Sequence, residues 1–193
     1  MHSKWKVWDY IKNNKEGIDQ SKSGLYAFYS FDSLIASILK GKFPRHLFYE
    51  EKLPVFNGKE LTLTWFEDNF LTLGLFGNQE SYVISNAENL NADCKEFLAE
   101  NELLLENRYL ILFYNKVDEL YKALIKKDEV TGIEIQAPAF WETDKLLDFL
   151  ADELKVQLSY ESKNMILNYV EHTPLALYNL LTKLSVNYGL ESV

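Results

Sequence analysis

Residues 25 to 136 show short apolar runs that alternate with stretches of helical spacing. A continuous apolar run of five to seven residues is typical of a strand buried on both faces. Residues 108–114 form the most apolar run, which predicts a central strand. The sequence predicts five strands in all, at residues 25–30, 46–50, 81–85, 108–114 and 131–136.

Helices are expected between these strands, because apolar residues recur there at intervals of three and four. They are predicted at residues 33–41, 64–73, 92–104 and 116–127. Residues 3–15 indicate a further amphipathic helix, with Trp5, Trp8 and Ile11 on one face. Strands that alternate with helices favour a parallel sheet with right-handed crossovers, so an α/β domain is expected over residues 1–137.

After Ala137 and Pro138 the pattern predicts helices alone, at residues 142–154, 160–171 and from Pro174 onward. Thr173 can cap the last of these, and Pro174 suits its first position. A small three-helix domain is therefore expected over residues 138–193. Its predicted buried positions are Leu146, Leu147, Leu150, Leu154, Met165, Ile166, Tyr169, Val170, Leu177, Leu180, Leu181 and Leu184.

The helix predicted from residue 64 has a capping box, since Glu67 follows Thr64 at the third position. Phe66, Phe70 and Leu73 share one face of this helix.

Leu75 and Phe76 follow Gly74, which suits the end of that helix. In one interpretation, Leu75 packs back on Phe70 in a Schellman stop. In the other, both side chains are offered to a partner. Local chemistry alone favours the first interpretation.

The turn after residues 25–30 is where an ATPase would hold its phosphate loop. Such a loop needs glycines and a Gly-Lys-Ser/Thr sequence, but residues 30–33 read Ser-Phe-Asp-Ser. Asp32 instead suits a helix N-cap. After the central strand, Tyr114-Asn115 stands where an acidic pair would hold magnesium. We expect a nucleotide-binding scaffold without a nucleotide site; an active ATPase with an atypical phosphate loop is the alternative.

Composition argues against several other classes of protein. The net charge is −9, and only Arg45 and Arg108 are arginines, so the basic stripe of a stand-alone DNA-binding protein is missing. Cys94 is the only cysteine, and it is expected to be a buried hydrophobe rather than a nucleophile. The three histidines lack ligand spacing. We therefore expect no catalytic residues, no metal and no cofactor, in a soluble cytoplasmic protein without a membrane span.

The order and spacing of these motifs resemble the δ subunit of the bacterial DNA polymerase III clamp loader. Residues 25–39 resemble its first strand and helix, and Leu-Gly-Leu-Phe-Gly at 73–77 resembles its clamp-contacting segment. Residues 81–90 resemble the strand and loop that follow. Residues 141–184 resemble its three-helix lid domain, which ends in Leu-Leu-Thr-Lys-Leu.

This resemblance implies an AAA+-like fold and a non-catalytic subunit that acts in DNA replication. Such a subunit binds the sliding clamp (β subunit) and helps to open the ring for loading onto primed DNA, alongside the γ/τ and δ′ subunits that handle ATP or complete the loader. Leu75 and Phe76 would enter an apolar pocket of the clamp, with Leu73 beside them. With the resemblance in view, partner contact becomes the favoured interpretation of Leu75 and Phe76.

Two features differ from that family. The chain stops before the helical collar domain that joins the subunits, which indicates a truncated or naturally short form and predicts a monomer. It is also less basic and poorer in arginine. We therefore expect DNA contact to be weak, or to occur only within the full complex.

Overall fold

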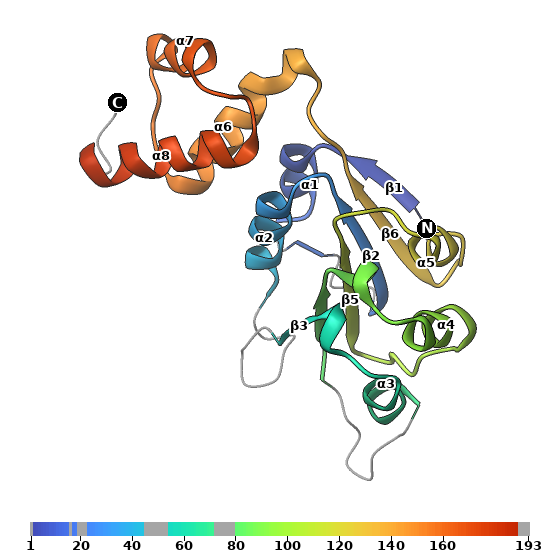
Figure 1. Cartoon of the computed structure of the whole chain (residues 1–193). Coiled ribbons are helices and arrows are strands. Elements are labelled where there is room, and N and C mark those ends of the chain that lie inside the picture. The colour runs from blue at the N-terminus through green and yellow to red at the C-terminus, as the bar shows by residue number, and fades with distance from the viewer. Residues whose placement is uncertain (1, 16, 19–22, 45–53, 72–79, 189–193) are drawn as a thin grey trace. The chain divides into compact units, whose positions relative to one another are not determined.

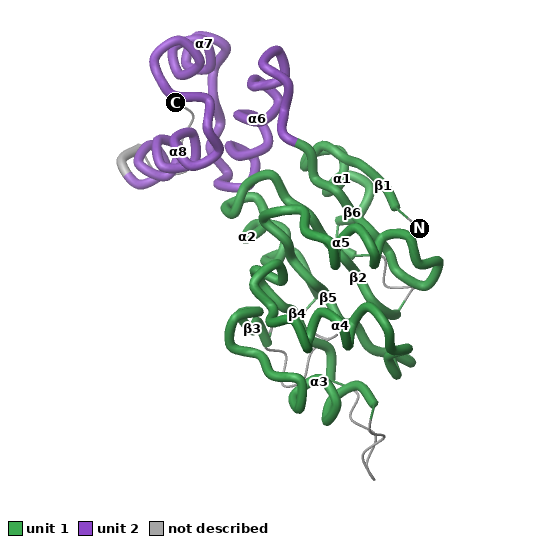
Figure 2. Tube along the Cα trace, turned by 45° about the vertical axis from the view of Figure 1, so that its right-hand side comes forward, with its two compact units in different colours: residues 1–136 green, residues 137–193 purple. Residues whose placement is uncertain are grey.

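The computed structural model describes residues 2–15, 17–18, 23–44, 54–71 and 80–188. The chain divides into two compact units, residues 1–136 and 137–193 (Figure 2). The first unit contains a parallel sheet with flanking helices, and the described part of the second contains helices alone.

The sheet confirms the predicted α/β class but has six strands rather than five. In spatial order they are β1-β6-β2-β5-β4-β3, and each described neighbouring pair is parallel. β5 is buried at every residue and lies between β2 and β4, which confirms its predicted central position. The strand bounds are β1 His2–Trp5, β2 Gly24–Ser30, β3 Val55–Asn57, β4 Tyr82–Ser85, β5 Tyr109–Tyr114 and β6 Val130–Ile135.

The additional strand, β1, overlaps the start of residues 3–15, where the sequence predicts one helix; within that range only α1 (Val7–Asn13) is helical. β1 forms an edge beside β6, and the Lys4 ammonium lies 3.2 Å from the Glu134 carboxylate. The helical spacing of Trp5 and Trp8 is misleading, because four residues are too few to distinguish an edge strand from a first helical turn.

The strand predicted at residues 46–50 lies outside the described residues. The strand beside β4 is β3, which follows Pro54 in a stretch where the sequence predicts neither a strand nor a helix. The Pro54 carbonyl accepts a hydrogen bond from the Val83 amide at 3.0 Å, so the pairing begins at the proline, which needs no donor of its own there. Short 3₁₀ turns follow β3 and β4, at η3 (Gly58–Glu60) and η4 (Ala87–Asn89).

Helices cover both faces of the sheet (Figure 1). On one face lie α1 and α2 (Ser33–Lys42). There the ring centroid of Phe28 from β2 lies 5.9 Å from the ring centroids of both Tyr10 and Phe43. On the other face lie α3 (Leu63–Phe70), α4 (Ala92–Glu100) and α5 (Glu119–Leu124). α4 and α5 are shorter than predicted.

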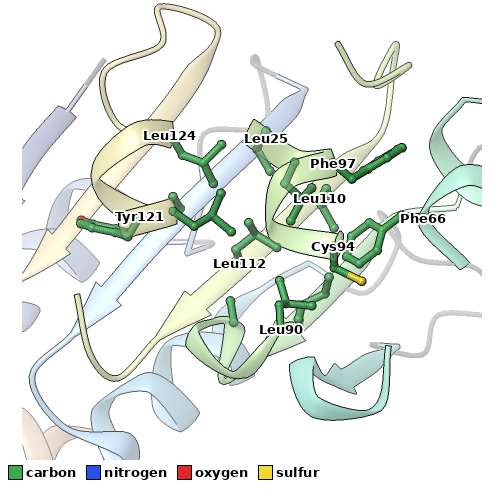
Figure 3. Close-up of a cluster of buried hydrophobic side chains, with 14 of the residues drawn as sticks. Leu25, Phe66, Leu90, Cys94, Phe97, Leu110, Leu112, Tyr121 and Leu124 are labelled. Carbon is green, nitrogen blue, oxygen red and sulfur yellow. The ribbon is translucent and has the colours of Figure 1, made fainter. Parts of the chain in front are cut away.

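The core under α3, α4 and α5 joins all three helices to the strands (Figure 3). Leu25, Leu110 and Leu112 contribute from β2 and β5. Cys94 is fully buried among them, which confirms its predicted role as a small hydrophobe. Burial also raises the pKa of its thiol above the ordinary value, so the thiol is poorly suited to act as a nucleophile.

The second unit contains η5 (Phe140–Glu142), α6 (Thr143–Leu154), α7 (Tyr160–Tyr169) and α8 (Pro174–Tyr188). The Thr173 hydroxyl accepts a hydrogen bond from the Ala176 amide at 3.3 Å, which confirms the predicted cap. The fully buried residues of the predicted set are Leu146, Leu147, Leu150, Ile166, Leu177 and Leu181.

The predicted burial of α7 is wrong at two positions. Met165 is 63% exposed and Tyr169 is 85% exposed, and Ile166 is the one fully buried residue of the helix. Val170, Leu154, Leu180 and Leu184 are half-buried. A helix of three turns at the edge of a small unit has little surface to pack against, so helical spacing overestimates its buried face. No described helix of either unit is long and apolar enough to cross a membrane.

Candidate functional site

The predicted site residues Leu73, Leu75 and Phe76 lie within residues 72–79, outside the described part of the chain. The structure describes the chain on both sides of this segment, from α3 up to Leu71 and from Glu80 into β4.

α3 begins earlier than the sequence predicts. Its N-cap is Thr62, whose hydroxyl accepts a hydrogen bond from the Trp65 amide at 3.3 Å. Thr62 has the extended backbone of a cap, while Thr64 lies within the helix, so the predicted capping box of Thr64 and Glu67 is wrong. Two threonines two residues apart offer the same cap chemistry, and the structure uses the first of them.

α3 also ends earlier. Its last residue is Phe70, and its C-cap is Leu71, whose amide donates to the Glu67 carbonyl at 3.1 Å. Gly74 is therefore not the helix stop that the sequence predicts. The predicted packing of Leu75 on Phe70 lies outside the described residues and stays a prediction.

The buried face of α3 confirms the predicted positions Phe66 and Phe70, both fully buried. The ring of Phe70 lies 5.7 Å from that of Trp65 and 5.9 Å from that of Tyr82. The guanidinium of Arg108 lies over the same ring, at 5.0 Å from its centroid. Phe70 is thus held by neighbours from three parts of the chain.

Arg108 is a residue whose role the sequence analysis missed. It is only 4% exposed, and its Nε donates to the Leu104 carbonyl at 2.6 Å. The Leu104 amide in turn donates to the Phe70 carbonyl at 3.0 Å, which satisfies one of the last carbonyls of α3. An arginine at the start of the most apolar strand was the available signal, because a charge is rarely buried there without partners.

Hydrogen bonds link the described residues on the two sides of positions 72–79. The Tyr82 hydroxyl lies 2.9 Å from the Asn69 carboxamide oxygen and 2.5 Å from a Glu80 carboxylate oxygen. The Ser81 hydroxyl accepts from the Tyr109 amide at 3.0 Å. The described residues on the two sides of positions 72–79 are therefore held by buried aromatic packing around Phe70 and by the hydrogen bonds of Tyr82 and Ser81.

The turn after β2 is built as a helix cap. One carboxylate oxygen of Asp32 accepts from the Leu34 and Ile35 amides at 2.8 and 3.3 Å, which confirms the predicted N-cap. These are the amides that a phosphate would need, and a carboxylate already occupies them. The residues present do not fit a bound phosphate.

The end of β5 is tied to the end of β4. The Asn115 side chain donates to the Asn86 carboxamide oxygen at 2.6 Å, and the Asn115 amide donates to the Glu88 carboxylate at 3.2 Å. Asp118 caps α5 with one oxygen and pairs with the Lys95 ammonium at 2.8 Å with the other. The carboxylates of Glu88 and Asp118 therefore both make contacts within the protein.

Neither histidine in the described ranges forms a ligand group. His2 lies 3.6 Å from Glu134 in the first unit, and His172 bonds to the Leu167 carbonyl in the second. Within the described ranges, no group of three or more histidine, cysteine or acidic residues could hold a metal ion.

The six described strands and their flanking helices form a parallel α/β fold, and this fold is similar to that of a clamp-loader δ protein. Among solved structures, it is similar to the Bacillus subtilis DNA clamp loader delta protein (YqeN), with 17% identity and a TM-score of 0.59. This similarity covers 97% of the present chain and 59% of that chain.

A second similar structure is a closed-state reconstruction of Hsp104 with ATPγS and casein. Its TM-score is 0.51 at 14% identity, over 94% of this chain and 42% of that one. No family model matches the sequence, and no curated protein matches it. At these identities the comparisons show the fold alone.

Proposed function

We propose that the chain acts as a clamp-loader subunit of the δ type, which binds a ring-shaped sliding clamp and helps to open it. The observation that carries this proposal is the fold similarity to the DNA clamp loader delta protein over 97% of the chain. The engaged cap of Asp32 supports a protein-binding role over an ATPase role, because the amides of the first helical turn are already satisfied.

In this proposal Leu75 and Phe76 are the anchors that enter an apolar pocket of the clamp, and Leu73 lies beside them. Large apolar anchors of this kind carry most of the energy of an interface. The burial of Phe66 and Phe70 supports the proposal, since it fixes the helix from which the chain continues to residues 72–79.

The subunit needs no catalytic residue or cofactor of its own for this role. A protein that binds one conformation of a ring more tightly than another shifts the ring toward that conformation. If the favoured conformation has a distorted subunit interface, binding promotes opening. The γ/τ and δ′ subunits would be its further partners, with DNA contacted weakly or only within the complex.

The test is the double substitution Leu75→Ala with Phe76→Ala, measured by surface plasmon resonance against the sliding clamp of the same organism. Each anchor is worth about 2 kcal/mol or more, so the affinity should fall by roughly a thousandfold. The melting temperature should change little, because neither residue belongs to the Phe66 and Phe70 face.

A matched control replaces two exposed apolar residues elsewhere, Val55→Ala with Val117→Ala, each 45% exposed. This control should bind the clamp as the unmodified chain does. Unchanged clamp affinity in a folded double variant would refute the proposal that Leu75 and Phe76 are the clamp-binding anchors. A melting temperature several degrees lower without a binding defect would instead support packing within the chain.

A further inference from the structure

Lys40 lies in the last turn of α2, which packs on the sheet face opposite α3, α4 and α5 (Figure 1). The residues of α2 that are buried against the sheet are Ile35, Ala36 and Leu39. Lys40 follows Ala36 by four positions, so its side chain begins on the same side of the helix. This position at the edge of an apolar face leaves the lysine side chain half-buried.

The groups in contact with the Lys40 ammonium carry no negative charge. Its Nζ atom donates to the Ser85 hydroxyl of β4 at 2.9 Å and lies 5.5 Å from the centroid of the Phe113 ring of β5. Within the described part of the chain, no carboxylate forms an ion pair with Lys40. Buried ammonium groups are usually paired with a carboxylate, and a hydroxyl and a ring stabilise the charge less.

These surroundings favour the neutral amine of Lys40. Burial lowers the pKa of Lys40 below its ordinary value, because the loss of water disfavours the charged form. A larger share of the side chain is then the free amine near neutral pH, and only the free amine is a nucleophile. Because the side chain is half-buried rather than fully buried, a small reagent can still approach it.

We infer that Lys40 is a modification site that accepts the acyl group of a small acyl phosphate. This inference does not depend on the proposed function. The Nζ lone pair attacks the carbonyl carbon, an N–C amide bond forms, and the C–O bond to the phosphate breaks. The phosphate leaves with that electron pair and takes up the proton that the amine releases, so no oxidant or reductant is needed. The acylated side chain is uncharged, which weakens its link from α2 to Ser85 of β4.

The first measurement compares Lys40 with Lys59 and Lys116, two exposed lysines of the same unit that form no ion pair with another described residue. The full chain is treated with acetyl phosphate near neutral pH, and mass spectrometry of its peptides gives the acylation rate at each lysine. Lys40 should react roughly threefold faster than either control or better, because a lowered pKa supplies more free amine. In guanidinium chloride, which unfolds the chain, the three rates should be similar.

A matched pair of substitutions at Ser85 tests the cause of this reactivity. Ser85→Asp places a carboxylate beside the Lys40 amine and favours its charged form, whereas Ser85→Asn has the same shape without the charge. Acylation of Lys40 should therefore be roughly tenfold slower in Ser85→Asp than in Ser85→Asn. Lys59 and Lys116 should react alike in the two variants, because neither contacts position 85.

Two results would overturn the inference. One is a Lys40 rate in the folded chain that does not exceed the rates of Lys59 and Lys116, and the other is an equal Lys40 rate in the two Ser85 variants. If either variant fails to fold, the unmodified chain decides alone, through the ratio of the folded to the denatured rate at each lysine. A ratio at Lys40 that is no higher than the ratio at Lys59 then overturns the inference.

Discussion

Tyr114 and Tyr121 each bury a hydroxyl group with no hydrogen-bond partner among the residues that the structure describes. Their ring centroids are 5.2 Å apart. Burial raises the pKa of Tyr114 well above its ordinary value, and the nearby Asp118 carboxylate acts in the same direction. Burial likewise raises the pKa of Tyr121. An unsatisfied buried hydroxyl lowers the free energy of unfolding, whereas a phenyl ring of the same shape would not.

Tyr114→Phe should therefore leave the free energy of unfolding unchanged or raise it by up to about 1 kcal/mol. The matched control is Tyr10→Phe, because the buried Tyr10 hydroxyl donates to the Gly17 carbonyl at 2.6 Å. That change should cost about 1 to 2 kcal/mol. Urea denaturation measures both variants, and a larger loss for Tyr114→Phe than for Tyr10→Phe would contradict the assignment.

The same substitution should change the response to alkaline pH. The pKa of Tyr114 is raised in the folded state, so the unfolded chain loses this proton first. The free energy of unfolding is therefore unaffected by this group below the unfolded pKa of about 10 and falls as pH rises above that value. The unmodified chain should therefore lose stability more steeply above about pH 10 than the Tyr114→Phe variant. Parallel pH profiles for the two proteins would count against this account.

At the scale of the helix, the start of α3 provides a direct comparison between two threonines. Thr62→Ala should cost about 1 kcal/mol of stability, because it removes the acceptor for the Trp65 amide. Thr64→Ala is the matched control and should cost little, since Thr64 is exposed within the helix. Urea denaturation measures the free energy of unfolding of both variants. A greater loss of stability from Thr64→Ala than from Thr62→Ala would support the capping box that the sequence predicts.

The elements that the sequence predicts well are those whose pattern is long or whose cap is unambiguous. β5 has six buried apolar residues, and Asp32 caps α2 by accepting from the Leu34 and Ile35 amides, so both predictions are confirmed. α3 is displaced because Thr62 and Thr64 both suit a cap. Tyr169 is mispredicted because its helical spacing says nothing of how much surface the neighbouring helices offer.

The candidate site was only partly predictable for a similar reason. The burial of Phe66 and Phe70 is predictable from their helical spacing. The contact between Arg108 and Phe70 is not, because the two residues are far apart in the sequence and no local pattern links them.

For the whole sheet, the carboxyl edge should not bind nucleotide. The turns after β2, β4 and β5 carry Asp32, Asn86 and Asn115, and each makes hydrogen bonds to neighbouring protein groups. Thermal-shift titration with Mg-ATP up to millimolar concentration should leave the melting temperature unchanged, because only a ligand that binds the folded state raises it. A saturable rise with ATP concentration would revive the alternative of an ATPase with an atypical phosphate loop.

The position of β1 beside β6 has a consequence for the order of folding. His2 pairs with Gly132, so the two partners lie about 130 residues apart in the chain. At synthesis rates of about 5–20 residues per second, the ribosome needs roughly 6 to 26 s to make that stretch. Contacts between such distant residues also carry a large entropic barrier. β1 is synthesised long before its partner β6, so it is expected to dock after the rest of the described sheet has formed.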